Sequence, residues 1–471
     1  MFRYLRPLLL LMVFPAIGII ATLLIDARFD LGRVQLACSL PEIRSARAVA
    51  CSEFDQIVLL RNASWATLLA SVAIPIVFLI IATVVGRSRF LIAIVFGVLV
   101  KLSIVLTGLL ILVDAAIVTF SLYWGFALTI SRIPVQILAL VALAGLAAAL
   151  GLLKSVFTLG HRLELKLLAK RLSPDRDEKI ISIINTIAQR IGAPIPDHII
   201  VGLDPNFFVT SADVKLFGES HSLKGETLYL SAPLLRILKP REFIAVIAHE
   251  LGHFVGQDTL YSKRFAPIYA QLTRSLDRLT SIDQASNIAN LPGVALLGIL
   301  MAVFASKERK IGRSRELAAD KIAASLVEPE ALIAALVKIS VIAPAWPELR
   351  TQNIESLNEG RILKNLCGLF ANFVAHVLAN PQNPAETILQ TMQRGRISHP
   401  TDTHPSNAER AKNLNVNIDS VAEAAIADLP FYLQAPESRI LPEALEEEVT
   451  MQEHQFLIAA GIATIPDYKS S

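Results

Sequence analysis

The chain has 471 residues, of which 53% are hydrophobic and 18% are charged, and its formal net charge at pH 7 is +3. This composition is too apolar for a typical wholly soluble protein, and the length leaves room for a membrane region beside a sizeable globular domain. The small net charge provides no basic stripe suited to nucleic acid, so we expect no nucleic-acid partner.

Apolar residues concentrate before residue 155, where we expect about four transmembrane helices. Pro7–Ile25 is long enough to span a bilayer, and we interpret it as an anchor because it lacks the cleavage site of a signal peptide. Three further apolar segments of spanning length are Ser64–Val85, Phe90–Val113 and Ile133–Leu153. Asp114–Ser131 is apolar and aromatic, and it is open whether it forms a fifth span, a re-entrant element or an interfacial helix.

Basic residues follow the last predicted span, namely Lys154, Arg162, Lys166, Lys170 and Arg171. The positive-inside rule therefore predicts that the rest of the chain lies on the cytoplasmic side of the membrane. An N-terminus on the same side requires an even number of spans, which favours four. The five arginines in the extracytoplasmic loop 26–63 weaken this prediction.

The three cysteines divide between the two predicted regions. Cys38 and Cys51 share the loop 26–63 on the oxidising side, where a disulfide is plausible. Cys367 stands alone and is expected to be a buried apolar residue. The sequence contains no CxxC pair or Cys/His array that would compete for a metal.

The segment His249-Glu250-Leu251-Gly252-His253 reads H-E-x-x-H. Residues 242–248 before it contain no helix breaker, and Lys239-Pro240 provides a helix start signal, so we expect the motif to lie on a helix. Histidines four residues apart project from one helical face and suit two ligands of a tetrahedral zinc. Glu250 is then placed to act as the general base on a water at the metal. The alternative is a helix whose histidines only satisfy buried hydrogen bonds.

A third metal ligand is available on the alanine-rich segment 313–324, which favours a helix. Glu316 and Asp320 lie one turn apart on the same face of this helix. Glu316 would complete a His-His-Glu site that keeps an open position, and Asp320 would accept the second ring N–H of a bound histidine. The alternative is a solvated helix face with ordinary charge alternation. Beside H-E-x-x-H, the sequence predicts one zinc ion per chain.

The H-E-L-G-H motif, Asp258 five residues after it and E-L-A-A-D at 316–320 together resemble the membrane-anchored zinc metalloendopeptidases typified by the bacterial HtpX protease and the CAAX prenyl endopeptidase. Three flanking segments match as well: 193–201, Gly225–Ser231 and Thr403–Arg410. The likeness covers about residues 155–415, and the combination is far more specific than any one motif.

This resemblance implies a zincin-like (gluzincin) domain with a small β-sheet. It also implies a bacterial inner-membrane location and membrane-associated protein or peptide substrates, with membrane protein quality control as the setting. His404 and Arg410 are implied to support the oxyanion, either directly or by bracing the site. One departure is that Asn206-Phe207-Phe208-Val209 stands where the family commonly has Asn-Ala-Phe-Ala, which leaves the shape of the substrate cleft open.

The segment Thr227–Ser231 is short and β-favouring, and the resemblance makes it an edge strand. Such a strand could bind the backbone of a substrate through Thr227, Leu228 and Tyr229 by strand addition. An ordinary inner strand is the alternative reading of the same residues.

The sequence therefore predicts a mainly α fold with three parts: a transmembrane region at 1–154, a metallopeptidase domain at 155–415 and a helical tail at 416–471. Leu291–Ala305 is too short for a comfortable span and predicts a buried or membrane-dipping helix. Residues 381–403 have the composition of a loop that covers the cleft.

The expected function is a zinc-dependent endopeptidase bound to the lipid bilayer. One alternative is a catalytically inactive zinc-binding membrane scaffold or adaptor, against which the open metal position and the intact Glu250 argue. A channel or transporter is poorly supported, because Lys101 and Asp114 are the sole intramembrane charges that the predicted spans offer.

Overall fold

The structure is a computed structural model that describes residues 2–85, 89–129, 133–158, 164–255, 298–299, 312–379, 405–427, 429 and 440–464. It divides into two compact units. The N-terminal unit comprises Met1–His161 and Arg264–Lys307, and the C-terminal unit comprises Arg162–Lys263 and Glu308–Ser471. The predicted boundaries at residues 154 and 415 stay predictions, as do the segments Leu291–Ala305 and 381–403, which lie almost wholly outside the described residues.

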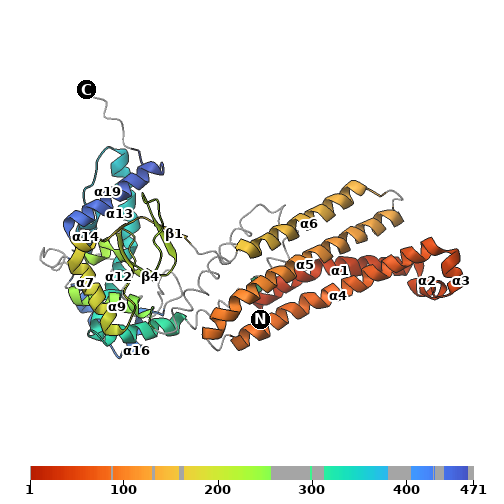
Figure 1. Cartoon of the computed structure of the whole chain (residues 1–471), viewed down its shortest axis with the longest axis horizontal. Helices are drawn as coiled ribbons and strands as arrows, with labels where there is room; N and C mark the ends of the chain where they lie inside the picture. Colours follow the sequence, from red (N-terminus) through yellow and green to blue (C-terminus); the bar gives the residue numbers. More distant parts are fainter. Residues whose placement is uncertain are drawn as a thin grey trace, which may run out of the picture. The chain divides into compact units, whose positions relative to one another are not determined.

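Long apolar helices make up the described part of the N-terminal unit. They are α1 (Phe2–Phe29), α4 (Ala48–Val85), α5 (Arg89–Thr129) and α6 (Val135–Thr158), and they lie alongside one another (Figure 1). The central helix α5 packs against α1, α4 and α6. All four helices are long and apolar enough to cross a bilayer, which confirms the prediction of an integral membrane protein.

The open question about Asp114–Ser131 has a simple answer. α5 continues without a break through Asp114 to Thr129, so this stretch extends the third long helix and is no separate span. α4 has 38 residues and α5 has 41. At 1.5 Å per residue these helices are about 57 Å and about 61 Å long. Since the hydrocarbon core of a bilayer is about 30 Å thick, both helices reach well beyond it.

The short helices α2 (Leu31–Cys38) and α3 (Pro41–Ala46) lie at one end of this unit (Figure 1). Together with the ends of α1, α4 and α5 that pack on them they form what we call the cap. Its buried core includes Phe54 of α4 and Trp124 of α5. A disulfide between Cys38 and Cys51, which the sequence had left open as plausible, ties α2 to the start of α4.

The C-terminal unit contains two small sheets. The larger has the strand order β2 (Ala169–Arg171), β3 (His198–Gly202), β6 (Thr227–Ser231) and β4 (Phe208–Thr210). β3 and β6 are parallel, and the two outer strands are antiparallel to their neighbours. The smaller sheet pairs β1 (Glu164–Leu167) with β5 (Asp213–Leu216) in parallel.

Side chains alternate between the two faces of the larger sheet. Val201 and Leu230 point into the main core of the unit, which the helices line. Ile200 and Tyr229 point to the other face, where they pack against Val214 and other apolar residues of the smaller sheet. The larger sheet is therefore buried on both faces, and it forms a platform for the helices of the main core.

An unlabelled helix at 312–324, nine labelled α-helices and a 3₁₀ turn complete the described part of the C-terminal unit. The labelled elements are α7 (Pro174–Ile191), α8 (Ala232–Leu235), α9 (Pro240–Gly252), α12 (Pro329–Ile342), η3 (Ala343–Ala345), α13 (Trp346–Asn358), α14 (Leu366–Ala379), α16 (Asn407–Asn413), α17 (Ile418–Ala427) and α19 (Glu443–Ala459). The chain is thus mainly α with a small sheet, as predicted. Cys367 lies fully buried in the main core, also as predicted.

A fifth helical stretch, Pro329–Asn358, is also long and apolar enough to cross a membrane by length and composition. It is interrupted by η3, and Leu332, Ile333 and Val337 are buried in the main core. Its single lysine, Lys338, is fully buried in an ion pair with Glu242. We therefore assign Pro329–Asn358 to the interior of the C-terminal unit.

The last described helix, α19, is held to the rest of the unit by charged and polar side chains. Glu446 forms a buried, two-bond contact with Arg236, which follows α8. Glu453 accepts a hydrogen bond from Nε of Arg350 on α13 at 2.7 Å, and Nε2 of the neighbouring His454 lies 2.9 Å from Oδ1 of Asn353. These polar contacts lie beside apolar ones made by Leu445 and Val449 in the main core.

Candidate metal centre

The helix that carries H-E-x-x-H has a well-defined start. Pro240 occupies the first helical turn, and the backbone N–H of Lys239 donates to Oε2 of Glu242 at 2.8 Å. Both carboxylate oxygens of Glu242 also accept from Nζ of Lys338 on α12, each at 2.8 Å. This buried ion pair fixes the beginning of α9 against α12, two turns before the histidines.

His249 lies in the last turn of α9, and His253 follows as its C-terminal cap in a helical conformation. The two imidazoles therefore stay on one face of the helix, with ring centroids 4.9 Å apart and an edge-to-face angle of 83°. His249 is buried and His253 is partly exposed. The local i, i+4 prediction for these two residues matches the structure.

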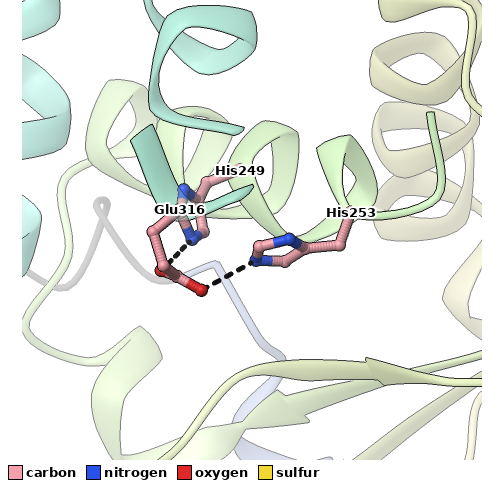
Figure 2. Close-up of side chains that lie close together, drawn as sticks. All are labelled: His249, His253 and Glu316. Atoms are coloured by element: carbon pink, nitrogen blue, oxygen red, sulfur yellow. Dashed lines mark ion pairs between the residues drawn. The ribbon is translucent and has the colours of Figure 1, made fainter. Parts of the chain in front are cut away.

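Residues 312–324 are helical and bring Glu316 to the two histidines. Oε2 of Glu316 lies 3.4 Å from Nε2 of His249, and Oε1 lies 3.5 Å from Nε2 of His253 (Figure 2). Gly252 of α9 faces this helix, and a Cβ there would be in ordinary van der Waals contact, at 3.5 Å, with Cα of Ala319. A larger side chain at 252 would push the two helices apart.

The three side chains fit a zinc ion. One ligand atom from each of them can be chosen so that all lie within 4.8 Å of one another. Zinc bonds of about 2.0–2.1 Å in a tetrahedron separate the ligand atoms by about 3.3 Å, close to both observed nitrogen-to-oxygen distances. Two imidazoles and one carboxylate form a donor set typical of a catalytic zinc with an open position, whereas structural zinc sites are closed and usually contain cysteine.

Asp320 lies one turn after Glu316 and is fully buried. Its Oδ1 is 2.9 Å from Nδ1 of His249, which is the contact predicted for a carboxylate that orients a bound histidine. Arg410 of α16 holds the same carboxylate with two hydrogen bonds, one of them from Nε to Oδ2 at 2.9 Å. Arg410 Nη2 also lies 3.2 Å from Nδ1 of His249. Arg410 was expected to support the oxyanion either directly or by bracing the site, and these contacts favour the bracing role.

The charges around His249 are closely balanced. Burial and the positive charge of Arg410 both lower the pKa of His249, but hydrogen bonds to Asp320 and Glu316 outweigh them and raise it to about 9. Burial also acts to raise the pKa of Asp320, yet its hydrogen bonds to His249 and Arg410 lower it below the usual value. Without a metal, the two carboxylates thus favour a protonated His249, and a metal ion binding there would displace the proton from Nε2.

Glu250 occupies the position between the two histidines and is half-buried. Burial lowers the pKa of Arg410, but nearby carboxylates raise it overall. Asp320 contributes most of this rise, and Glu250 contributes less. A carboxylate at this place, neither sealed in the core nor fully solvated, has the environment expected of a general base.

The predicted edge strand is wrong. β6 lies between β3 and β4 and is paired on both sides. Thr227, Leu228 and Tyr229 are fully buried, so strand addition to them is excluded. The outer strand on this side is β4, to which no further strand pairs within the described residues. The prediction failed because β4 has three residues and gives no recognisable strand signal in the sequence.

The bulky residues of the Asn206–Val209 segment pack against the sheet. Phe207 is buried in the main core, and Phe208 stacks on the ring of Tyr229 with centroids 4.8 Å apart. His404 and Asp258, which the resemblance nominated, lie outside the described residues.

Two supporting residues were missed in the sequence analysis. Lys338 had a visible signal, namely a single charge within an apolar helix. Asn407 lies in the Thr403–Arg410 segment noted above, but nothing there indicates its contacts with α12, which are made across more than sixty residues of chain.

Comparison with known proteins adds independent support. The profile of Peptidase family M48 matches residues 174–417, just over half of the chain. Among curated proteins, a protease HtpX homolog of Bifidobacterium longum is 30% identical over 200 residues, which is 40% of this chain and 62% of that protein. One from Archaeoglobus fulgidus is 25% identical over 247 residues (50% and 67%), and one from Acaryochloris marina is 26% identical over 260 (52% and 74%).

The chain thus spans roughly three fifths to three quarters of the length of these relatives. No solved structure matches it. The matched region contains His249, His253, Glu316, Asp320 and Arg410, which are the residues that the fold brings together. With its long apolar helices and this site, the chain belongs to Peptidase family M48 as an integral membrane member resembling HtpX.

Proposed function

We propose that this protein is a membrane-bound, zinc-dependent endopeptidase that acts on membrane-associated proteins, with membrane protein quality control as its setting. The observation that supports this most directly is the convergence of His249, His253 and Glu316 from two helices, with Glu250 beside them. Membership of a peptidase family agrees with it.

A zinc ion held by these three side chains would supply Lewis-acid chemistry, lowering the pKa of a water and polarising a peptide carbonyl. The chain's own contribution is positional. Glu250 is placed to take a proton from the attacking water and return it to the leaving amine. Asp320 and Arg410 hold the His249 ring in one orientation. In this proposal His404 supports the oxyanion.

For the substrate we propose addition to β4, the outer strand of the larger sheet. β4 lies beside β6 in antiparallel register, with Val209 opposite Leu228, and it contacts α9. A peptide paired with the outer side of β4 would run along the helix that carries Glu250. Backbone pairing of this kind recognises extended chains with little dependence on sequence, which suits unfolded or misfolded substrates.

The course of the chain supports a cytoplasmic location for the C-terminal unit. α5 runs toward the cap, because Trp124 near its end packs in the cap core. α6 returns antiparallel to α5: the earlier Gly108 of α5 lies beside Leu153 late in α6, and the later Ala115 of α5 lies beside Gly145 earlier in α6. α6 therefore leaves the N-terminal unit at the end away from the Cys38–Cys51 disulfide. A disulfide belongs on the oxidising side of a bacterial inner membrane, so the opposite end faces the cytoplasm.

The test is cleavage of casein, or of the protein itself, by the detergent-solubilised chain beside Glu250→Gln, with zinc determined in both. Glu355→Gln, which removes an exposed carboxylate of α13, is the matched control. We expect the unmodified chain and the control to cleave, Glu250→Gln to be inactive, and all three to hold about one zinc per chain.

The second candidate function is a zinc-binding membrane scaffold without turnover. It takes precedence if all three proteins hold zinc and none cleaves casein, even with added membrane fractions. If none of them holds zinc, the metal site itself is wrong.

A further inference from the structure

The short helix α16 joins two parts of the candidate metal centre that come from distant regions of the sequence. Arg410, near its middle, reaches Asp320 and His249. Asn413 at its end donates to the backbone carbonyl of Leu317 at 3.4 Å, so α16 lies along the helix 312–324. Because α16 has seven residues, its own backbone hydrogen bonds cannot hold it in place. Its position must come from tertiary contacts.

The contact that anchors the beginning of α16 is made by Asn407. Its Nδ2 donates to Oγ of Ser340 at 3.1 Å and, less closely, to the carbonyl of Leu336 at 3.4 Å, both on α12. Ser340 Oγ in turn donates to the Leu336 carbonyl at 2.8 Å. Asn407 and Arg410 are three residues apart, so they lie on neighbouring positions of the same helical face.

α12 is the element on which the metal centre is aligned. Through Lys338 it holds Glu242 at the start of α9, which carries His249 and His253. Through Ser340 it holds Asn407 at the start of α16, which carries Arg410. The helix with the two histidines and the arginine beside them are therefore both positioned by α12, through side chains only two residues apart.

We propose that Asn407 is a positioning residue for the metal centre. By anchoring α16 on α12 it places Arg410 against Asp320, and Asp320 in turn orients His249. Within the described residues, the side-chain hydrogen bonds of Asn407 go to α12, and not to the metal ligands or the proposed substrate strand. This inference rests on the proposed function for its relevance to catalysis, but its test does not need turnover.

The experiment is a double-mutant cycle on zinc affinity, measured by competition with a chelating dye in the full-length, detergent-solubilised protein. Residues that orient a metal-bound histidine typically change metal affinity by 10–100-fold. We expect Asn407→Ala to weaken zinc binding by about tenfold in the unmodified protein and by less than about twofold when Asp320→Asn is already present. Such coupling is expected only if Asn407 acts through Asp320.

Two further variants separate positioning from general stability. Ser340→Ala removes one acceptor from the α12 side without altering α16, and it should weaken zinc binding in the same direction but by less. Asn365→Ala removes a comparable interhelical bond, from Nδ2 of Asn365 to Glu446 of α19, far along the sequence from the metal ligands. It should lower thermal stability and leave the zinc dissociation constant unchanged.

The outcomes distinguish this inference from the proposed function. Equal effects of Asn407→Ala in both backgrounds, or a loss of thermal stability with unchanged zinc affinity, would overturn the positioning role alone. Coupled effects in a protein that cleaves nothing would support the positioning role while the endopeptidase function fails. If Asn407→Ala does not fold, a Ser340→Ala variant with unchanged zinc affinity overturns the inference.

Discussion

Oδ1 of Asp320 lies 2.9 Å from Nδ1 of His249, while Nε2 of the same ring faces Glu316. When Nδ1–H donates to the carboxylate, the lone pair of Nε2 is directed toward the other two ligand side chains. This contact would hold the imidazole in one tautomer and one orientation if it binds a metal. The buried carboxylate of Asp320 is itself neutralised by Arg410, which donates two hydrogen bonds to it.

Asp320→Asn should weaken zinc binding by about 10–100-fold, since the ring orientation and the basicity of His249 both depend on the carboxylate. The zinc dissociation constant, measured by dye competition, checks this. Asp419→Asn, at an exposed position in α17, is the control and should bind zinc as the unmodified protein does. An affinity unchanged in Asp320→Asn would show that the aspartate has no part in the site.

Glu316→Gln and Glu250→Gln should fail in different ways. The first removes the anionic ligand, so the zinc content should fall from about one per chain to near zero after dialysis. The second keeps the three ligands, so zinc should remain while the cleavage rate falls at least about 100-fold. Metal analysis of both variants, combined with a casein assay, separates ligand from base. Full zinc occupancy in Glu316→Gln would contradict the assignment of Glu316.

Lys338→Met should destabilise the C-terminal unit strongly. It leaves Glu242 buried without its cation, and breaking a buried ion pair from one side costs about 3–5 kcal/mol. Thermal denaturation in detergent measures the loss. The double variant Glu242→Gln/Lys338→Met should recover most of it, because glutamine can still cap Lys239 and no charge remains buried. Equal stability of the single and double variants would refute the role of the pair.

The docking of α19 should weaken on acidification. Burial holds the pKa of His454 below its ordinary value of about 6.5, so the folded state binds this proton less readily than the unfolded state. The stability that His454 contributes is therefore complete above about pH 6.5 and is lost as the pH falls below it. Burial raises the pKa of the adjacent Glu453, although Arg350 acts to lower it. Protonation of Glu453 at lower pH should therefore favour the folded state, which is opposite to the effect of His454.

Proteolytic susceptibility of the chain after α14, followed from pH 8 to pH 5, measures this effect. His454→Gln keeps a hydrogen-bonding side chain next to Asn353 but cannot take up a proton, so its profile should be flatter than that of the unmodified protein. Identical profiles for the two proteins would remove His454 as the cause.

The parts of the site that were predictable are those encoded by local spacing. His249 and His253, like Glu316 and Asp320, are four residues apart on helices without breakers, so helical geometry alone puts each pair on one face. The contact between the two pairs joins residues far apart in the sequence. The sequence indicates it only indirectly, because a catalytic zinc needs a third protein ligand. The neighbours of β6 are also a long-range property, and the prediction failed there.

The reach of α5 was ambiguous for a different reason. Hydropathy is interrupted at Asp114, yet the backbone has no reason to end a helix there, because neither glycine nor proline lies near it. A scale that measures transfer into lipid describes where a helix leaves the bilayer, whereas breakers and caps determine where the helix ends.

The disulfide between Cys38 and Cys51 also reports whether the cap of a given molecule has reached an oxidising compartment. A chain can acquire it only after the cap has reached an oxidising compartment, whereas Cys367 in the C-terminal unit is a free, buried thiol. In the proposed topology the cap lies on the oxidising side, so alkylation under denaturing conditions should label one cysteine in a correctly inserted chain and three in a chain whose cap never crossed the membrane. The cap thus provides a chemical mark of completed insertion that mass spectrometry can read without any tag.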